Sequence, residues 1–173
     1  IIGECSHLRG AEITLDMPTV GGTENIIMAA SLADGDTILE NAAREPEIVD
    51  LANFLNSCGA QISGQGTSCI TIHGVSSLKG TTYSVMPDRI AAATYMAAAA
   101  VTGGTVLLRD VNSEHLLPVL SAFESTGCAV MQSGSELLLR APQRLKPVRH
   151  VRTMPYPGFP TDAQAPVMTM AAV

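Results

Sequence analysis

Residues 40–50 read Glu40-Asn41-Ala42-Ala43-Arg44-Glu45-Pro46-Glu47-Ile48-Val49-Asp50, a charged turn between a short apolar run and a helical pattern. The preceding Thr37-Ile38-Leu39 is typical of a short strand. Pro46 predicts the first residue of a helix, where its fixed φ and missing N–H cost nothing. Apolar side chains then recur with the spacing of one helix face up to Gly59, which predicts the helix end; they are Ile48, Leu51, Ala52 and Leu55. Taken alone, this is an ordinary strand-to-helix connection.

An internal repeat extends this local pattern to the whole chain. Residues 29–37 recur 68 positions later as residues 97–105, and residues 55–62 recur as residues 123–130, with Gly59 matching Gly127. Each copy reads as a strand, a loop, a helix of small residues, a glycine turn, a strand, an amphipathic helix and two short strands that pair with each other. The sequence therefore predicts an α/β fold built from repeated βαβαββ units.

The first helix of each copy has an unusual composition. Residues 26–33 and 90–101 are apolar on nearly every side and rich in alanine. A helix that is hydrophobic all round belongs in a protein interior. We therefore expect these helices to be buried, with the sheets outside them.

The second helix of the second copy should start later than its counterpart in the first. The repeat offset aligns Glu114 with Pro46 and would place Pro118 inside a helix, where proline removes a hydrogen bond and clashes with the preceding turn. We expect the helix to start near Leu117, so that Pro118 lies in its first turn.

Composition excludes several classes of protein. The net charge is −6 with 10 Lys and Arg residues and 3% aromatic residues, which argues against a nucleic-acid partner. The longest nearly apolar stretch, residues 90–101, is too short to span a bilayer, so we expect a soluble cytoplasmic protein with no membrane partner. The four cysteines form no C-x-x-C pair and do not cluster with the histidines, so we expect reduced thiols, no metal site and no cofactor.

Four motifs resemble the enolpyruvyl transferases, and among them those that act on UDP-N-acetylglucosamine. They are residues 40–50, Thr19-Val20-Gly21, Pro87-Asp88-Arg89 and Phe159-Pro160-Thr161-Asp162. The resemblance covers nearly the whole chain, whereas the chain is well under half of the usual length in that family. It implies an inside-out α/β barrel, with three repeated units in each of two domains that face each other across a cleft.

The resemblance also implies a domain assignment. Residues 1–86 would be the last βαβαββ unit of the first domain, and residues 87–173 the first unit and part of the second unit of the second domain. The third copy of the repeat begins with an expected strand over 148–152 and a helix from Thr161 to Val173, where the sequence stops. We therefore expect the chain to be truncated at both ends.

The activity implied by the resemblance is transfer of the enolpyruvyl group of phosphoenolpyruvate to the 3-hydroxyl of UDP-N-acetylglucosamine, the first committed step of peptidoglycan synthesis. The family's loop cysteine, its phosphoenolpyruvate-binding lysine and a late arginine would lie outside residues 1–173, so the chain alone is expected to be inactive. Two alternatives stay open: the sister transferase acting on shikimate 3-phosphate, and a non-catalytic structural fragment. The oligomeric state is left open.

A first candidate site is the loop before the first small-residue helix, whose members are Met17, Pro18, Thr19, Val20 and Gly21. Gly21 and Gly22 would let backbone N–H groups at a helix N-terminus approach an anion, although such a pair is also common in a plain turn. The resemblance implies contact with the uridine diphosphate group. Met17 stands where some relatives carry a lysine, which puts one phosphate contact in doubt.

A second candidate site is the end of the proline-rich loop at Thr161 and Asp162. An Asp at a helix start is commonly an N-cap. The resemblance instead implies that Asp162 meets the attacking sugar hydroxyl and orients or deprotonates it, which makes Asp162 the catalytic candidate. Arg89 and Glu45 are further candidates for substrate contact, but both equally suit charge interactions at helix N-termini or between domains.

Overall fold

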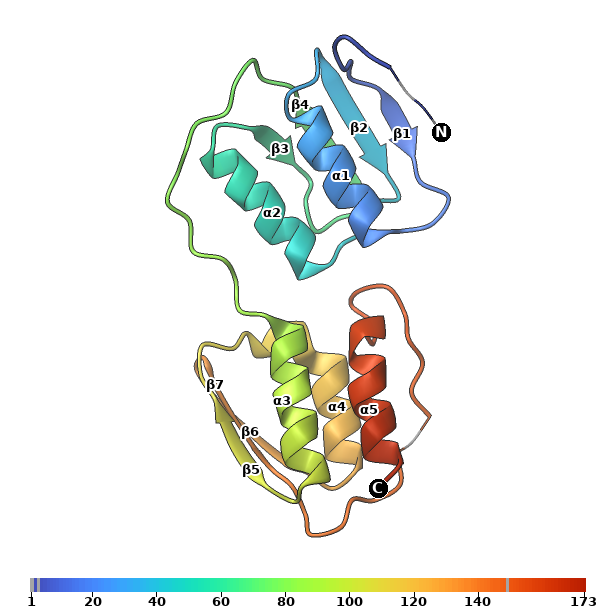
Figure 1. Ribbon diagram of the computed structural model, residues 1–173, viewed down its shortest axis with the longest axis vertical. Helices are drawn as coiled ribbons and strands as arrows, with labels where there is room; N and C mark the ends of the chain where they lie inside the picture. The colour runs from blue at the N-terminus through green and yellow to red at the C-terminus, as the bar shows by residue number, and fades with distance from the viewer. Residues whose placement is uncertain (1, 3, 149) are drawn as a thin grey trace. The chain divides into compact units, whose positions relative to one another are not determined.

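The computed structural model describes residues 2, 4–148 and 150–173 of the chain. These residues form two compact units, Ile1–Met86 (unit 1) and Pro87–Val173 (unit 2). Each unit has a sheet with helices packed on one of its faces (Figure 1). The assignment of the two units to different domains of a larger protein stays a prediction.

Unit 1 has the predicted βαβαββ order. Its elements are β1 (Glu12–Thr14), α1 (Val20–Ala30), β2 (Asp36–Glu40), α2 (Pro46–Ser57), β3 (Gln61–Ser63) and β4 (Cys69–His73). The strands are ordered β1-β2-β4-β3 across the sheet, and β1 pairs in parallel with β2 while the other pairs are antiparallel. Because β1 and β2 are parallel, their carboxyl ends lie at the same edge of the sheet.

The core of unit 1 follows from the alternation of side chains along its strands. Leu39 of β2 and Ile70 and Ile72 of β4 are fully buried, while the residues between them face outward. They pack against Ile27 of α1 and Ile48 of α2 in one cluster. The helix predicted from Pro46 is confirmed, and the chain reverses after it at Gly59, whose φ of +103° favours glycine.

Unit 2 repeats most of this plan. Its elements are α3 (Arg89–Val101), β5 (Thr105–Leu108), the 3₁₀ helix η1 (Ser113–Leu116), α4 (Leu117–Ser125), β6 (Ala129–Ser133), β7 (Glu136–Arg140), the 3₁₀ helix η2 (Thr161–Ala163) and α5 (Gln164–Ala171). The sheet is antiparallel in the order β5-β7-β6. The predicted late start at Leu117 is confirmed, with Pro118 in the first turn of α4. Gly127 has a φ of +91°, matching Gly59.

The bounds expected for the first of the small-residue helices were wrong. The helix expected over 26–33 runs from Val20 to Ala30, because Thr19 caps its N-terminus and the two glycines after it are helical. Within the described residues, each of these helices also has an exposed part. Met28 of α1 is 46% exposed and Tyr95 of α3 is 63% exposed, because the sheet and the neighbouring helices cover only part of each helix.

The first strands expected for the second and third copies are absent from the described residues. The segment before α3 instead lies along unit 1, where the Lys79 N–H donates to the Cys58 carbonyl over 2.8 Å. In the third copy, residues 148 and 150–152 form no strand, and Arg149 lies outside the described residues. In unit 1 the first strand, β1, pairs with β2, the strand that follows α1. Among the described residues no strand follows α5, so residues 148 and 150–152 have no such pairing partner.

None of the helices in the described part of the chain combines the length and the apolar character that crossing a bilayer requires.

Tyr83 fastens the segment after β4 to α2. Its hydroxyl donates to a carboxylate oxygen of Asp50 over 2.9 Å, and its ring packs edge-on against Phe54 with centroids 5.5 Å apart. Partial burial raises the pKa of the Tyr83 hydroxyl above its ordinary value of 10.0, and the hydrogen bond and negative charge of Asp50 raise this pKa further. The protonated hydroxyl therefore contributes to the stability of unit 1.

We predict that Tyr83→Phe lowers the free energy of unfolding by about 1 kcal/mol at neutral pH, because one hydrogen bond is lost while the ring remains. A raised folded-state pKa means that this contribution is fully present below the unfolded pKa and is lost as the pH rises through the folded value. The difference in the free energy of unfolding between wild type and variant should thus shrink above about pH 10.

Denaturant titrations across that pH range measure this difference in the free energy of unfolding. Tyr95→Phe, at an exposed tyrosine, is the control, and its free energy of unfolding should equal that of the wild type. A difference that stays constant or widens above that pH would contradict the assignment of the proton to Tyr83.

Candidate substrate-binding loops

The loop before α1 lies on the surface of unit 1. Met17 is 69% exposed, Val20 is 37% exposed, and Pro18 and Gly21 are exposed as well. Thr19 is the N-cap, and its hydroxyl accepts from the Gly22 N–H over 3.5 Å. The first N–H groups of a helix lack intrahelical partners and carry a partial positive charge. All five predicted residues therefore surround an accessible helix N-terminus.

The fold requires glycine at one of positions 21 and 22 but not at the other. A Cβ at Gly22 would lie 2.6 Å from Cγ2 of Thr19, so glycine there is needed by the cap. A Cβ at Gly21 would meet no atom within 4 Å, and the residue is helical with no left-handed φ. The fold of unit 1 therefore does not require glycine at position 21, which sequence reasoning could not distinguish from position 22.

Glu45 begins α2 at the N-cap position and is half-buried. Its backbone is extended, with φ −54° and ψ 147°, and its side chain makes no capping hydrogen bond to the first turn. The starts of α1 and α2 lie at the same end of the helix layer of unit 1 (Figure 1), because each helix follows one of the parallel strands β1 and β2. Glu45 and the Thr19 loop thus share one end of unit 1.

The loop before α3 is built differently. The Asp88 carboxylate accepts from the N–H groups of Ile90 and Ala91 over 2.8 and 3.0 Å and so occupies the helix N-terminus itself. Arg89 is only 5% exposed, and its guanidinium carbon lies 5.6 Å from the centroid of the Tyr156 ring. Tyr156 belongs to the proline-rich loop of the third copy and was not among the predicted site residues.

Thr161 and Asp162 lie in η2, at the end of that proline-rich loop. Both are exposed, while their neighbours Phe159 and Ala163 are 5% and 0% exposed. Neither η2 nor α5 has a side-chain capping hydrogen bond at its N-terminus. Asp162 is therefore not an N-cap in this structure, and its carboxylate faces solvent from a backbone that is anchored on both sides.

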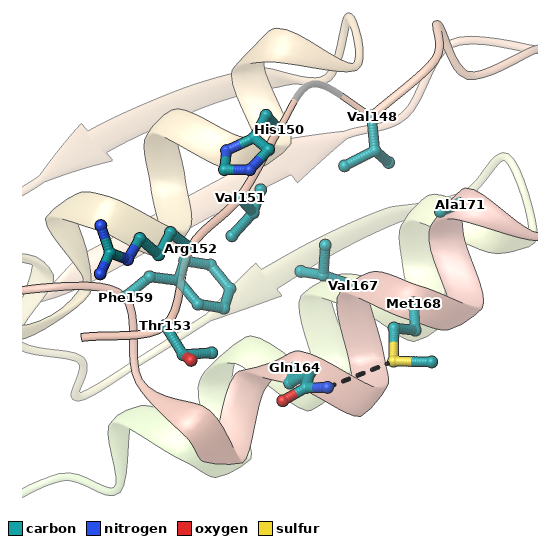
Figure 2. Close-up of a pocket in the computed structure, with 10 residues that line it drawn as sticks. All are labelled: Val148, His150, Val151, Arg152, Thr153, Phe159, Gln164, Val167, Met168 and Ala171. Carbon is teal, nitrogen blue, oxygen red and sulfur yellow. Dashed lines mark hydrogen bonds between the residues drawn. The ribbon is translucent and has the colours of Figure 1, made fainter.

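Two hollows in unit 2 contain none of the predicted site residues. The larger, of about 650 Å³, runs between α5 and the segment before the proline-rich loop, where Val151, Phe159 and Val167 line it together with the polar His150 and Arg152 (Figure 2). The smaller, of about 460 Å³, lies by the loop after β5 and the turn between β6 and β7. Among the residues that the structure describes, no three His, Cys, Asp or Glu side chains could jointly hold a metal ion.

Two known proteins of similar sequence share one name. The chain is 57% identical over 170 residues to the UDP-N-acetylglucosamine 1-carboxyvinyltransferase of Desulfovibrio desulfuricans, covering 98% of this chain and 41% of that protein. It is 55% identical over 173 residues to the enzyme of the same name from Solidesulfovibrio magneticus, covering 100% of this chain and 41% of that protein. The chain thus spans about two fifths of the length of these curated relatives.

Solved structures support the fold. The enolpyruvyl transferase NikO from Streptomyces tendae superposes with a TM-score of 0.80 at 20% identity, covering 96% of this chain and 42% of that one. EPSP synthase from Acinetobacter baumannii gives a TM-score of 0.54 at 23% identity, covering 96% of this chain and 37% of that one. The α/β fold of repeated units is therefore that of the enolpyruvyl transferases. Residues 1–173 match the sequence family described as EPSP synthase (3-phosphoshikimate 1-carboxyvinyltransferase), and the chain belongs to this family.

Proposed function

We propose that residues 1–173 are part of an enzyme that transfers the enolpyruvyl group of phosphoenolpyruvate to the 3-hydroxyl of UDP-N-acetylglucosamine and releases phosphate. The observation that carries this proposal is the 57% identity, over 98% of the chain, to a relative named for that nucleotide sugar. The similarity to EPSP synthase structures, at 23% identity, concerns the fold alone and gives less support to shikimate 3-phosphate as the substrate. The proposed setting is the cytoplasm, in the peptidoglycan synthesis on which cell shape and division depend.

In this proposal the diphosphate of the nucleotide sugar binds at the N-terminus of α1. The exposed N–H groups of its first turn and the aligned peptide dipoles favour an anion at this point. Gly21 leaves open space there, so a phosphate oxygen can come close to the backbone. Met17 adds no charge, and the interaction therefore depends on backbone groups and on the Thr19 hydroxyl.

Asp162 supplies the proton acceptor in this proposal. The sugar 3-hydroxyl must lose its proton as its oxygen bonds to the phosphate-bearing carbon of phosphoenolpyruvate, and a carboxylate within hydrogen-bond reach can orient that hydroxyl and take the proton. The exposure of Asp162 and the absence of a capping bond at η2 and α5 leave its carboxylate available for this role.

We predict that Asp162→Asn in the whole enzyme lowers kcat by about 10²–10⁴-fold, the range for a positioned acid–base group, with a smaller change in affinity for UDP-N-acetylglucosamine. Because Asp162 caps no helix, the melting temperature should stay close to that of the wild type. Steady-state phosphate release and thermal unfolding measure the two quantities on the same preparation. A variant that is destabilised but turns over normally would remove Asp162 from the mechanism.

A second prediction concerns Gly21. Gly21→Ala should leave the free energy of unfolding unchanged or raise it by up to about 1 kcal/mol, because alanine favours the helix and its Cβ meets no atom. If the diphosphate hydrogen-bonds to this turn, the added methyl should weaken binding of UDP-N-acetylglucosamine by roughly 10- to 100-fold, the worth of a hydrogen bond to a charged group.

Isothermal titration of the nucleotide sugar measures that affinity. Gly80→Ala is the matched control, since a Cβ at Gly80 also meets no atom within 4 Å but lies away from the loop. Equal affinities for the wild type and both variants would place the diphosphate elsewhere.

A further inference from the structure

Arg89 is the one charged residue that is buried among the residues the structure describes. Its burial needs compensation, because moving a guanidinium out of water is costly unless the group keeps favourable partners. The face of Tyr156, 5.6 Å away at its centroid, supplies one such partner through a cation–π interaction. This contact joins the first residue of α3 to a loop of the next copy of the repeat.

The loop that carries Tyr156 is closed on itself. The Met154 N–H donates to the Phe159 carbonyl over 3.0 Å, and the Gly158 N–H donates to the Pro155 carbonyl over 2.8 Å. The Phe159 side chain is buried in the core of unit 2. The loop is thus fixed at its base, and Tyr156, near its tip, contacts Arg89 of α3.

Asp162 follows directly on this loop. It lies in η2, which packs against α3, the same helix whose first residue is Arg89. A single helix therefore contacts both η2, which contains Asp162, and the Tyr156 ring. Because only Pro160 separates this loop from η2, motion of the Tyr156 loop would also move η2.

We propose that Arg89 is a positioning residue that holds the loop over residues 153–160, through its stack on Tyr156, so that Asp162 keeps its orientation. This inference rests on the proposed role of Asp162. It assigns Arg89 to loop support and not to substrate contact, because an arginine that is 5% exposed offers almost no surface to a ligand. A planar guanidinium can stack on a ring, whereas an ammonium cannot do so in the same way.

The test uses substitutions on both sides of the stack in the whole enzyme. Arg89→Lys keeps the positive charge and removes the planar surface, and Tyr156→Leu keeps an apolar side chain and removes the ring face. Tyr156→Phe is the matched control, since it keeps the ring. We expect the first two variants to lower kcat by roughly 10- to 100-fold, the cost of a misplaced catalytic group, with little change in KM for UDP-N-acetylglucosamine. The control should retain more activity than Tyr156→Leu, because it keeps the ring face.

The double variant Arg89→Lys with Tyr156→Leu should lose less activity than the product of the two single losses, because both single variants remove the same contact. Hydrogen exchange gives a readout that does not depend on turnover. Amides of residues 153–163 should exchange roughly 5- to 30-fold faster in Arg89→Lys and Tyr156→Leu, and more slowly in Tyr156→Phe than in Tyr156→Leu.

Three outcomes would overturn the inference. A raised KM in Arg89→Lys that Tyr156→Leu does not reproduce would make Arg89 a substrate contact. A lower melting temperature with normal kcat in Arg89→Lys and Tyr156→Leu would show that the contact between Arg89 and Tyr156 contributes to stability alone. Unchanged exchange in residues 153–163 would show that the stack does not hold the loop. If the wild-type enzyme fails to use UDP-N-acetylglucosamine while the exchange pattern is as expected, the proposed function fails and the loop support stands.

Discussion

The parallel pairing of β1 with β2 is the constraint from which the arrangement of unit 1 follows. Its register sets Glu12 beside Ile38 and Thr14 beside Glu40, so both strands end at one edge of the sheet. The helix after each strand must then begin at that edge. Two further contacts fix the turn between β2 and α2: the Thr23 hydroxyl, fully buried on α1, accepts from the Ala43 N–H over 3.0 Å, and the Asn41 amide donates to the Leu15 carbonyl over 2.8 Å.

The repeated plan allows the loops at the helix starts to diverge while the framework stays the same. In unit 1 the loop before α1 leaves its first-turn N–H groups accessible behind a threonine cap. In unit 2 the corresponding position before α3 is filled by the Asp88 carboxylate, which repels an anionic ligand. The same scaffold therefore presents an accessible helix N-terminus in one copy and one closed by a carboxylate in the next. Function on such a fold depends on the loops and not on the repeat itself.

Sequence reasoning succeeded where a local rule dominates. Proline chemistry predicted the start of α4 at Leu117, and the repeat predicted the glycine that follows α2 and α4. It failed where distant parts of the chain decide the outcome. The Gly21-Gly22 pair was expected in the loop before the helix, although the Thr19 cap brings both residues into α1. The Arg89 and Tyr156 contact joins two copies of the repeat and leaves no periodic signal, so only the structure could bring it to light.

Gly21 shows how the diphosphate site that we propose would lower the stability of the fold that carries it. A glycine in a helix loses more backbone entropy on folding than an alanine would, and no neighbour in unit 1 needs the missing side chain. Selection for thermal stability alone would therefore replace this residue. Stabilising substitutions of this kind are easy to find and often reduce function. Under the proposed function, glycine should therefore be kept at position 21 in any stability-guided engineering, because an alanine there would obstruct the diphosphate.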